Sequence, residues 1–186
     1  NFIYVNLTIN NANPECGSIP KNGCNVTQNT VFDNPSGSVS YVLKDGITIA
    51  ASGITLDCNN VTLNALFYQN PINDGIKMQG VNNNVIKNCN VENYNHNMYI
   101  LNSNNNTFDN SVMKIAKING LKLLNSNFNQ FKLNTIEANG IGNANGAGVY
   151  LQGSSNNQFI NNNIEDNTNA FGGLYLKLSS NNNLIK

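Results

Sequence analysis

Apolar residues recur in short alternating groups along residues 75–186, and polar stretches rich in asparagine separate these groups. Five segments share the pattern and begin 22, 23, 28 and 25 residues apart, at Gly75, Asn97, Gly120, Gly148 and Gly173. A repeat of this length is typical of a solenoid, in which each repeat forms one structural unit that stacks on the next.

Within each segment the apolar residues alternate as they do in strands. If the first residue is position zero, positions one and three are apolar in every copy, which predicts a strand with one buried face. No window keeps the helical spacing, so helical and leucine-rich solenoids are excluded. We predict an all-β fold, a right-handed parallel β-helix of about six or seven coils. The apolar columns at positions one, three, eleven and sixteen are Ile76, Met98, Leu121, Val149, Leu174; Met78, Ile100, Leu123, Leu151, Leu176; Ile86, Phe108, Phe131, Phe159, Leu184; and Val91, Met113, Ile136, Ile164.

Polar columns support the same register. Charge signs alternate down two outward columns, as neighbouring strands prefer. Position zero is Gly or Asn, which predicts a corner with left-handed backbone geometry. Position nine is always asparagine, and because an amide both donates and accepts, a hydrogen-bonded ladder is expected there. The charged columns are Lys87, Asp109, Lys132 and Glu92, Lys114, Glu137, and the asparagine column is Asn84, Asn106, Asn129, Asn157, Asn182.

The first part of the chain is less periodic. Residues 46–65 resemble an early coil, whereas residues 1–45, which contain an alternating strand over 3–9 and a cysteine loop, are predicted to cap the coils of residues 46–186. Cys16 and Cys24 bracket that loop and are candidates for a local disulfide. Cys58 and Cys89 fall at different points of the repeat, so the sequence does not pair them, and buried free thiols are expected.

Composition limits the partners. Asparagine makes up 45 of the 186 residues, and ten Lys balance ten acidic residues with no Arg. A nucleic-acid partner is disfavoured because no basic face is present, and no apolar stretch is long enough to span a membrane. The chain starts at Asn1 without a signal-like segment, as a processed product or a fragment would. It stops inside a repeat, so the last coil is expected to be completed by following sequence or by another subunit.

The segment SYVLKDGITIAASGITLDCNNVTL is similar to the opening of parallel β-helix repeat proteins of microbial, especially archaeal, cell surfaces. The SNNNT and SSNNQFINNNI segments resemble the coil repeats of the same family, and the resemblance covers residues 40–186. This family includes surface-layer and adhesin-like proteins, carbohydrate-active enzymes and a periplasmic copper-maturation protein. Asn60 and Val61 stand where relatives have Gly-His.

Catalytic and metal chemistry find little support in the residues. Glycoside hydrolysis needs two carboxylates across one bond, but Glu165 and Asp166 are neighbours that point to opposite faces of a strand. Asp57, Asp74 and Asp109 are isolated. The copper ligands that the resemblance implies would be soft or imidazole groups. Met78 and Met98 lie in core columns, and His96 is the only histidine, so neither a metal nor a cofactor is predicted.

Position two gives the most distinctive surface feature. It contains the Tyr–Lys stripe, a set of outward side chains on the first strand of successive coils that could stack on sugar rings or on a neighbouring subunit, or could simply suit exposed strands. The stripe comprises Lys77, Tyr99, Lys122, Tyr150 and Tyr175.

Four sequons, at Asn6, Asn25, Asn60 and Asn105, are glycosylation candidates, although the asparagine content alone accounts for their number. The favoured function is a non-enzymatic extracellular structural protein, a self-assembling subunit of a cell-surface layer or filament. A carbohydrate-binding or adhesion module is the alternative, with possible glycan partners. A polysaccharide lyase or hydrolase is the third hypothesis.

Overall fold

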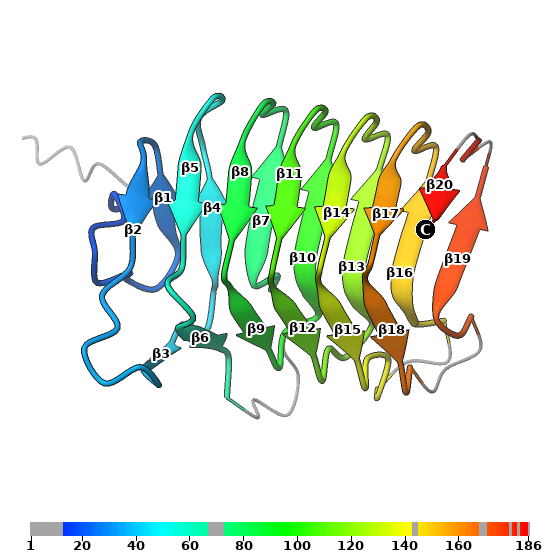
Figure 1. Cartoon of the computed structure of the whole chain (residues 1–186). Helices are drawn as coiled ribbons and strands as arrows, with labels where there is room; N and C mark the ends of the chain where they lie inside the picture. The colour runs from blue at the N-terminus through cyan, green and yellow to red at the C-terminus, as the bar shows by residue number, and fades with distance from the viewer. Residues whose placement is uncertain are drawn as a thin grey trace, which may run out of the picture.

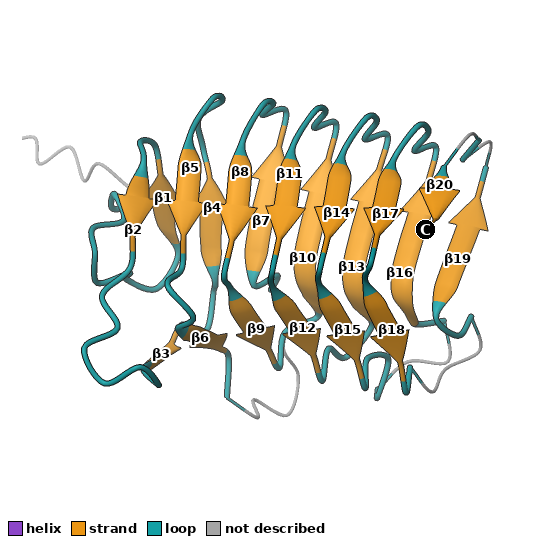
Figure 2. Ribbon diagram, in the orientation of Figure 1, coloured by secondary structure: helices purple, strands orange, loops and turns teal. Residues whose placement is uncertain are grey.

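A computed structural model describes residues 13–66, 73–142, 145–167, 171–178, 180–181 and 183–185. The predicted right-handed parallel β-helix is confirmed. Six complete coils of three strands follow one another, and β19 and β20 belong to a seventh. The coils stack in a row from the N-terminal to the C-terminal end (Figure 1), and the described residues contain strands and corners but no helix (Figure 2).

Equivalent strands of successive coils pair in parallel and form three sheets. The first sheet contains β1 (Cys24–Val26), β4 (Ile47–Ile49), β7 (Ile76–Gln79), β10 (His96–Leu101), β13 (Asn119–Leu124), β16 (Ala147–Gln152) and β19 (Leu174–Lys177). The second contains β2 (Thr30–Val31), β5 (Thr55–Asp57), β8 (Val85–Lys87), β11 (Thr107–Asp109), β14 (Gln130–Lys132), β17 (Gln158–Ile160) and β20 (Leu184–Ile185). The third contains β3 (Ser40–Val42), β6 (Thr62–Asn64), β9 (Asn90–Glu92), β12 (Val112–Lys114), β15 (Thr135–Glu137) and β18 (Asn163–Glu165).

The inward columns fill the space between the sheets. The side chains of Phe108, Phe131 and Phe159 are buried and stack face to face, with ring centroids 4.8 and 4.7 Å apart. Each ring comes from an equivalent position of a successive coil, so the spacing of the rings follows the spacing of the strands. The outward charge columns also pair as expected, and Lys114 Nζ lies 3.5 Å from Glu92 Oε2.

Asparagine is the commonest residue at the corners because the corners require left-handed backbone geometry. Four positions in a typical coil have positive φ angles, as at Asn102, Asn105, Asn110 and Ile115. Asparagine enters this region at lower cost than most residues. The chain nonetheless places other residues there, including Phe128, whose side chain remains 57% exposed.

The glycines of position zero serve a different purpose from the one predicted. Gly75, Gly120 and Gly148 do not have positive φ, so the prediction of a left-handed corner at this column is wrong. A Cβ atom at Gly120 would lie 2.5 Å from Asn139 Nδ2, and one at Gly148 would lie 2.5 Å from Asn167 Nδ2. Glycine is required here because side chains of the same or a neighbouring coil occupy the space that a Cβ atom would need, Val91 and Tyr94 in the case of Gly75.

The asparagine column forms a ladder along the axis. The Asn84 N–H donates to Asn106 Oδ1, and the Asn106 N–H donates to Asn129 Oδ1, both at 2.9 Å. The column continues through Asn157, whose N–H donates to Asn183 Oδ1 at 2.8 Å. Asn182 lies outside the described residues, and Phe159 pairs with Ile185 rather than Leu184. The sequence register was therefore one residue early in the last repeat.

The structure contains other ladders that the sequence pattern did not predict. The N–H groups of Ser103, Ser126 and Ser154 each donate to the hydroxyl of a serine in the next coil. Asparagine forms two further ladders. In one, the Asn134 N–H donates to Asn162 Oδ1. In the other, the Asn139 N–H donates to Asn167 Oδ1. Each ladder satisfies backbone donors at a corner where the strands end.

The coils begin earlier than the predicted boundary at residue 46. β1, β2 and β3 pair with β4, β5 and β6, so residues 24–42 already form a coil rather than part of a cap. The predicted strand over residues 3–9 lies outside the described residues. The structure joins Cys16 to Cys24 in a disulfide next to this first coil.

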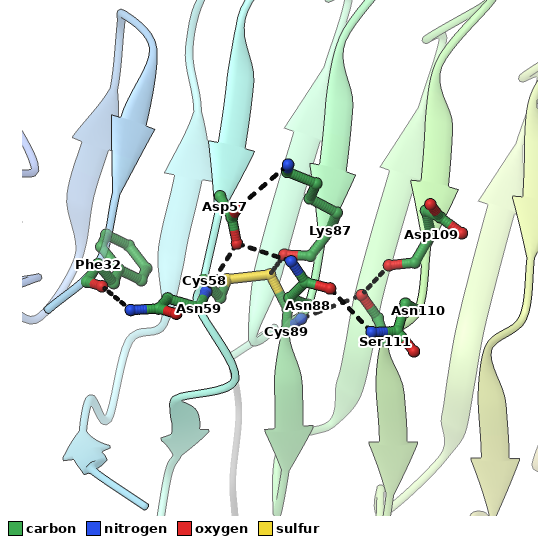
Figure 3. A network of polar contacts seen from close by, with 10 residues as sticks. All are labelled: Phe32, Asp57, Cys58, Asn59, Lys87, Asn88, Cys89, Asp109, Asn110 and Ser111. Atoms are coloured by element: carbon green, nitrogen blue, oxygen red, sulfur yellow. Dashed lines mark hydrogen bonds and ion pairs between the residues drawn. A yellow bond between two sulfur atoms is a disulfide. The ribbon is translucent and has the colours of Figure 1, made fainter. Parts of the chain in front are cut away.

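Cys58 and Cys89 form a second disulfide between adjacent coils, so the expectation of two free thiols is wrong. β5 and β8 are in register, as are β6 and β9, but the corner after β5 contains two extra residues. This insertion obscured the pairing in the sequence. Around the disulfide, Asp57 forms an ion pair with Lys87 at 3.1 Å and accepts hydrogen bonds from Asn88 Nδ2 and the Asn59 N–H (Figure 3).

Candidate functional site

The candidate site is the outer face of the first sheet at its C-terminal half. Tyr99 pairs with Lys77 on one side and with Lys122 on the other, and Lys122 pairs with Tyr150, which in turn pairs with Tyr175. The five side chains of the Tyr–Lys stripe therefore lie on consecutive strands. From Tyr99 to Tyr175 the stripe extends over three strand spacings, about 14 Å.

Aromatic rings and an ammonium group alternate along this stripe. Lys122 Nζ lies 5.3 Å from the ring centroid of Tyr99 and 6.0 Å from that of Tyr150. Tyr150 and Tyr175 have centroids 5.4 Å apart, and Phe171 stacks on Tyr175 at 4.1 Å. Cation–π contacts of this kind are worth about 0.5–2 kcal/mol and hold Lys122 over the sheet.

A cavity of about 370 Å³ lies beside the stripe. Its lining includes Asn119, Lys122 and Tyr150 from β13 and β16, and Lys177 from the end of β19. Ile118, Asn145 and Phe171 come from the segments that precede β13, β16 and β19 and complete the wall. The lining combines aromatic, amide and cationic groups and contains no carboxylate.

His96 lies at the start of β10, next to Lys122. The side chain is 7% exposed, and burial, together with the charge of Lys122, lowers its pKa to about 3, so the imidazole is neutral at physiological pH. Asn119 Nδ2 lies 3.2 Å from Nδ1, and Lys122 Nζ lies 3.3 Å from Nε2. Both ring nitrogens therefore have a neighbour that carries hydrogen atoms.

The partners of Asn119 fix the orientation of its amide group. Asn119 Oδ1 accepts a hydrogen bond from the Ala147 N–H at 2.8 Å, so the amide group must present Nδ2 to the imidazole. A neutral imidazole that accepts at Nδ1 carries its proton on Nε2. Lys122 Nζ lies at Nε2 as a second hydrogen-bonding neighbour, so a neutral ring accepts from either Asn119 or Lys122 but not from both.

The carboxyl group of Asp74 interacts electrostatically with Lys77, Lys122 and Tyr99 on this face. Burial raises its pKa to about 6, against the opposing effects of Lys77, Lys122 and a hydrogen bond from the His96 N–H. Burial also lowers the pKa of Lys122, whereas Asp74 raises it. The pKa of Tyr99 is raised by burial and by Asp74. Two lysines, a histidine and a tyrosine thus surround one carboxyl group that titrates near neutral pH.

The other acidic side chains that the sequence singled out lie apart from this face. Asp57 forms its ion pair with Lys87 at the corner after β5, and Asp109 lies on the outward face of β11 in the second sheet. Glu165 ends β18 in the third sheet, where Asn163 Nδ2 donates to it, and Asp166 follows in a corner with a φ of 52°. The structure brings none of these four carboxylates to the stripe.

The soft and imidazole donors do not converge on a metal site. Met78, Met98 and Met113 are fully buried in the core, and all four cysteines are in disulfides. His96 is flanked by the amide of Asn119 and the amine of Lys122. Residues 13–66, 73–142 and the shorter described segments contain no group of three or more His, Cys, Asp or Glu side chains arranged to hold a metal ion.

Three sequon asparagines lie in the described residues. Asn25 is within β1 and pairs with Thr48, whereas Asn60 and Asn105 are exposed at corners with φ angles of 62° and 57°. Asn6 lies outside the described residues. In the part of the chain that the structure describes, no helix has the length and apolar character needed to cross a bilayer.

Sequence reasoning found the stripe but missed its surroundings. Phe171, Asn119, Asn145 and Lys177 lie at positions outside the apolar, charged and asparagine columns, and the sequence singled out His96 only as the one histidine. Unequal spacings between repeats, notably the 28 residues from Gly120 to Gly148, marked the longer segments that form the wall of the cavity.

Comparison with solved structures shows a similar fold in the catalytic domain of a GH87 alpha-1,3-glucanase variant in complex with tetrasaccharides. The two chains share 19% sequence identity with a TM-score of 0.54, and the match covers 76% of this chain but 32% of the glucanase domain. The chain thus spans about a third of that domain. No curated protein matches the sequence.

A protein-family model described as "Periplasmic copper-binding protein (NosD)" matches residues 57–186. The match includes every strand from β6 onward and well over half of the chain. The chain therefore belongs to the NosD family of β-helix proteins.

Proposed function

We propose that this protein is a glycan-binding module that holds a sugar chain along the Tyr–Lys stripe. The observation that carries the proposal is the row of half-buried aromatic rings on the outer face of the first sheet, beside a cavity of about 370 Å³ lined by Tyr150, Phe171 and two amides. Aromatic faces stack on the apolar faces of sugar rings, and amides satisfy hydroxyl groups. The row is comparable in length with a short oligosaccharide.

The similar β-helix of the glucanase catalytic domain, which was solved with bound tetrasaccharides, supports the class of ligand. The proposal is binding rather than hydrolysis. Hydrolysis of a glycosidic bond requires two carboxyl groups that face the same bond, and none of the described residues that line the cavity carries a carboxylate. Asp74 stands as a single acid among two lysines.

Copper binding does not enter the proposal, although the family description names it. The thioether sulfurs are enclosed in the core, the thiols are oxidised to disulfides, and the imidazole faces an amine. Among the described residues, the donors thus do not fit a copper site.

The family's periplasmic description and the two disulfides support a location outside the cytoplasm, because disulfides persist in oxidising compartments. Display at the cell surface and occupancy of the sequons remain predictions. Intact-mass measurement of the native protein would test the sequons.

A glycan array followed by isothermal titration calorimetry with the best ligand would test the proposal. Replacing both Tyr150 and Tyr175 by Ser is expected to weaken binding at least tenfold, because each removes a stacking surface. Phe128→Ser is the control, since it removes an exposed aromatic ring at the corner between β13 and β14, outside the stripe. Failure of the wild type to bind any glycan, or equal binding by the double variant, would contradict the proposal.

Self-assembly through the ends of the coils is the second candidate. β19 and β20 each pair on one side in the described residues, and Leu178 and Ile185 are 63% and 55% exposed next to them. A second copy could continue the sheets. Light scattering and electron microscopy of concentrated protein should show elongated particles that the Leu178→Lys, Ile185→Lys variant does not form. A strictly monomeric wild type would contradict this second candidate.

A further inference from the structure

We propose that Asn145 is the residue at which the folded protein deamidates, and that the reaction adds a negative charge to the cavity beside the Tyr–Lys stripe. Asparagine deamidates most readily when a glycine follows it, because glycine has no Cβ atom to hinder its backbone nitrogen. The sequence contains four such pairs, which begin at Asn22, Asn119, Asn139 and Asn145. The structure places these four asparagines in different surroundings.

The reaction takes place between two neighbouring residues. The Gly146 nitrogen loses its proton to solvent and forms a bond to Cγ of Asn145, and the Cγ–Nδ2 bond breaks with release of ammonia. Water then opens the cyclic imide at either of its two carbonyl carbons, which yields aspartate or isoaspartate. One water molecule is consumed, one ammonia molecule is released, and no oxidant or reductant takes part.

Solvent access and local charge decide the rate of this reaction. The nucleophile is already next to the amide, so only the leaving ammonia and the attacking water must pass between the side chain and solvent. The attack also builds up negative charge, which a nearby cation stabilises and a nearby carboxylate opposes.

Burial protects two of the four pairs. Asn119 is 2% exposed in β13, where its Oδ1 accepts a backbone hydrogen bond. Asn139 is fully buried, and its Nδ2 donates to the carbonyl of Met113 at 2.9 Å. The Gly140 N–H donates to the carbonyl of Ala116 at 2.8 Å, so the nitrogen that would attack is held in the ladder. Reaction at either pair would break buried hydrogen bonds, which is costly.

Asn22 is exposed, but its surroundings oppose the reaction. Its Nδ2 donates to the Asp45 carboxylate, and its Oδ1 accepts from the Asp45 N–H at 2.6 Å. The Gly23 N–H donates to the carbonyl of Gly46 at 2.8 Å. Negative charge at this amide would develop beside a carboxylate, so exposure alone does not make Asn22 reactive.

Asn145 combines exposure with a positive environment. It is exposed in the turn two residues before β16, and it lines the same cavity as Lys122 and Lys177. Asp74 partly offsets the charge of Lys122, but none of the described residues that line the cavity carries a carboxylate. Two ammonium groups thus favour the negative charge of the intermediate at Asn145, whereas Asp45 opposes it at Asn22.

The product changes the chemistry of the cavity. An amide both donates and accepts hydrogen bonds, whereas the carboxylate that replaces it only accepts. A sugar hydroxyl that accepts from the amide would lose this bond, so deamidation is expected to lower glycan affinity by about threefold or more. This consequence rests on the proposed function, whereas the site of reaction does not.

Peptide mapping by mass spectrometry tests the site of reaction in the folded wild type during incubation at mildly alkaline pH. Asn145 is expected to convert at least about tenfold faster than Asn119 or Asn139, and faster than Asn22. In concentrated urea the four pairs should convert at similar rates, because only the fold distinguishes them. Conversion of Asn22 before Asn145, or similar rates for all four in the folded protein, would overturn the inference.

Two variants provide a matched comparison. Ion-exchange chromatography separates the deamidated protein by its added negative charge. Asn145→Gln, whose longer side chain forms the cyclic imide far more slowly, is expected to lack this acidic fraction, whereas Asn22→Gln should form it at the wild-type rate. An acidic fraction that persists in Asn145→Gln and disappears in Asn22→Gln would contradict the assignment.

Calorimetry with the glycan that the array identifies tests the consequence. The acidic fraction of the wild type should bind more weakly than the unmodified fraction from the same incubation, and equal affinity would show that deamidation does not regulate the site. Failure of freshly prepared protein to bind any glycan would contradict the proposed function, and the order of conversion of the four asparagines would still decide the inference on Asn145.

Discussion

Asn129 Oδ1 accepts two hydrogen bonds from Asn106 in the preceding coil, one from the backbone N–H at 2.9 Å and one from Nδ2 at 3.1 Å. The Nδ2 group of Asn129 in turn donates to the backbone carbonyl of Ser103 and to Asn157 Oδ1. Both side chains are fully buried. The asparagine column is therefore an internal element of the corner, in which the amides of Asn106 and Asn129 each join three coils.

Replacing Asn129 by Ala is expected to lower the free energy of unfolding by about 2–4 kcal/mol, because buried donors on Asn106 lose their acceptor. Urea denaturation followed by circular dichroism would measure the loss. Gln130→Ala, one residue later and on the outer face of β14, is the control and should change stability by about 0.5 kcal/mol or less. A loss for Asn129→Ala as small as that of the control would show that the ladder adds little to stability.

Phe131 and Phe128 offer a paired test of core and corner. Phe131→Ala removes the middle ring of the buried stack and is expected to cost about 3–5 kcal/mol. Phe128→Asn replaces an exposed aromatic residue in left-handed geometry by a residue that accepts this geometry, so it should leave stability unchanged or raise it slightly. Thermal unfolding of both variants would check this opposite behaviour, and destabilisation by Phe128→Asn would contradict it.

The Cys58–Cys89 disulfide closes a separation of 31 residues, against 8 for Cys16–Cys24. In the chain-entropy description, replacing Cys58 and Cys89 by Ser should lower the free energy of unfolding by about 3–4 kcal/mol. Replacing Cys16 and Cys24 by Ser should lower it by about 2–3 kcal/mol. Chemical denaturation of the two double variants would rank them. The reverse order would indicate that contacts of the local loop, rather than the constraint between coils, dominate.

Asp74 makes stability depend on pH. Its pKa is about 6 in the folded protein and close to 3.8 when unfolded, so its favourable contribution is complete below about pH 3.8 and is lost as the pH rises through 6. Asp74→Asn keeps an oxygen acceptor for the His96 N–H and is expected to be more stable than the wild type above pH 6, by up to about 3 kcal/mol. The difference between their unfolding free energies from pH 4 to pH 8 measures this effect, and a difference that does not vary with pH would exclude it.

The repeat pattern was sufficient to predict the coils, because the residues of each inward column are set by the alternation of apolar and polar residues within a short segment. Ile76 and Met78, or Leu121 and Leu123, must face inward together once either is in a strand, and the period of the segments then requires the strands to stack. The positions of the Tyr–Lys stripe followed from the same register. Fold class, strand order and the outward face of each residue were thus set by the sequence in the regular part of the chain.

Features that depend on unequal coils were decided by the tertiary structure. Two extra residues after β5 brought Cys58 to Cys89, and one extra residue before β20 put Asn183 in the column assigned to Asn182. The zero-position glycines leave room for side chains from other strands and corners, which no local pattern reveals.

The candidate site divides in the same way. Alternation along the strands determined that Tyr99, Lys122, Tyr150 and Tyr175 share one face. Only the folded chain places His96 beside Lys122 and brings Phe171 and Asn145 over the sheet, because these residues come from segments between repeats whose paths depend on packing against the coils. The periodic sequence therefore determines the strands and the residues that face outward on them. The contacts that distinguish the candidate site come from the segments between repeats, and these depend on the tertiary structure.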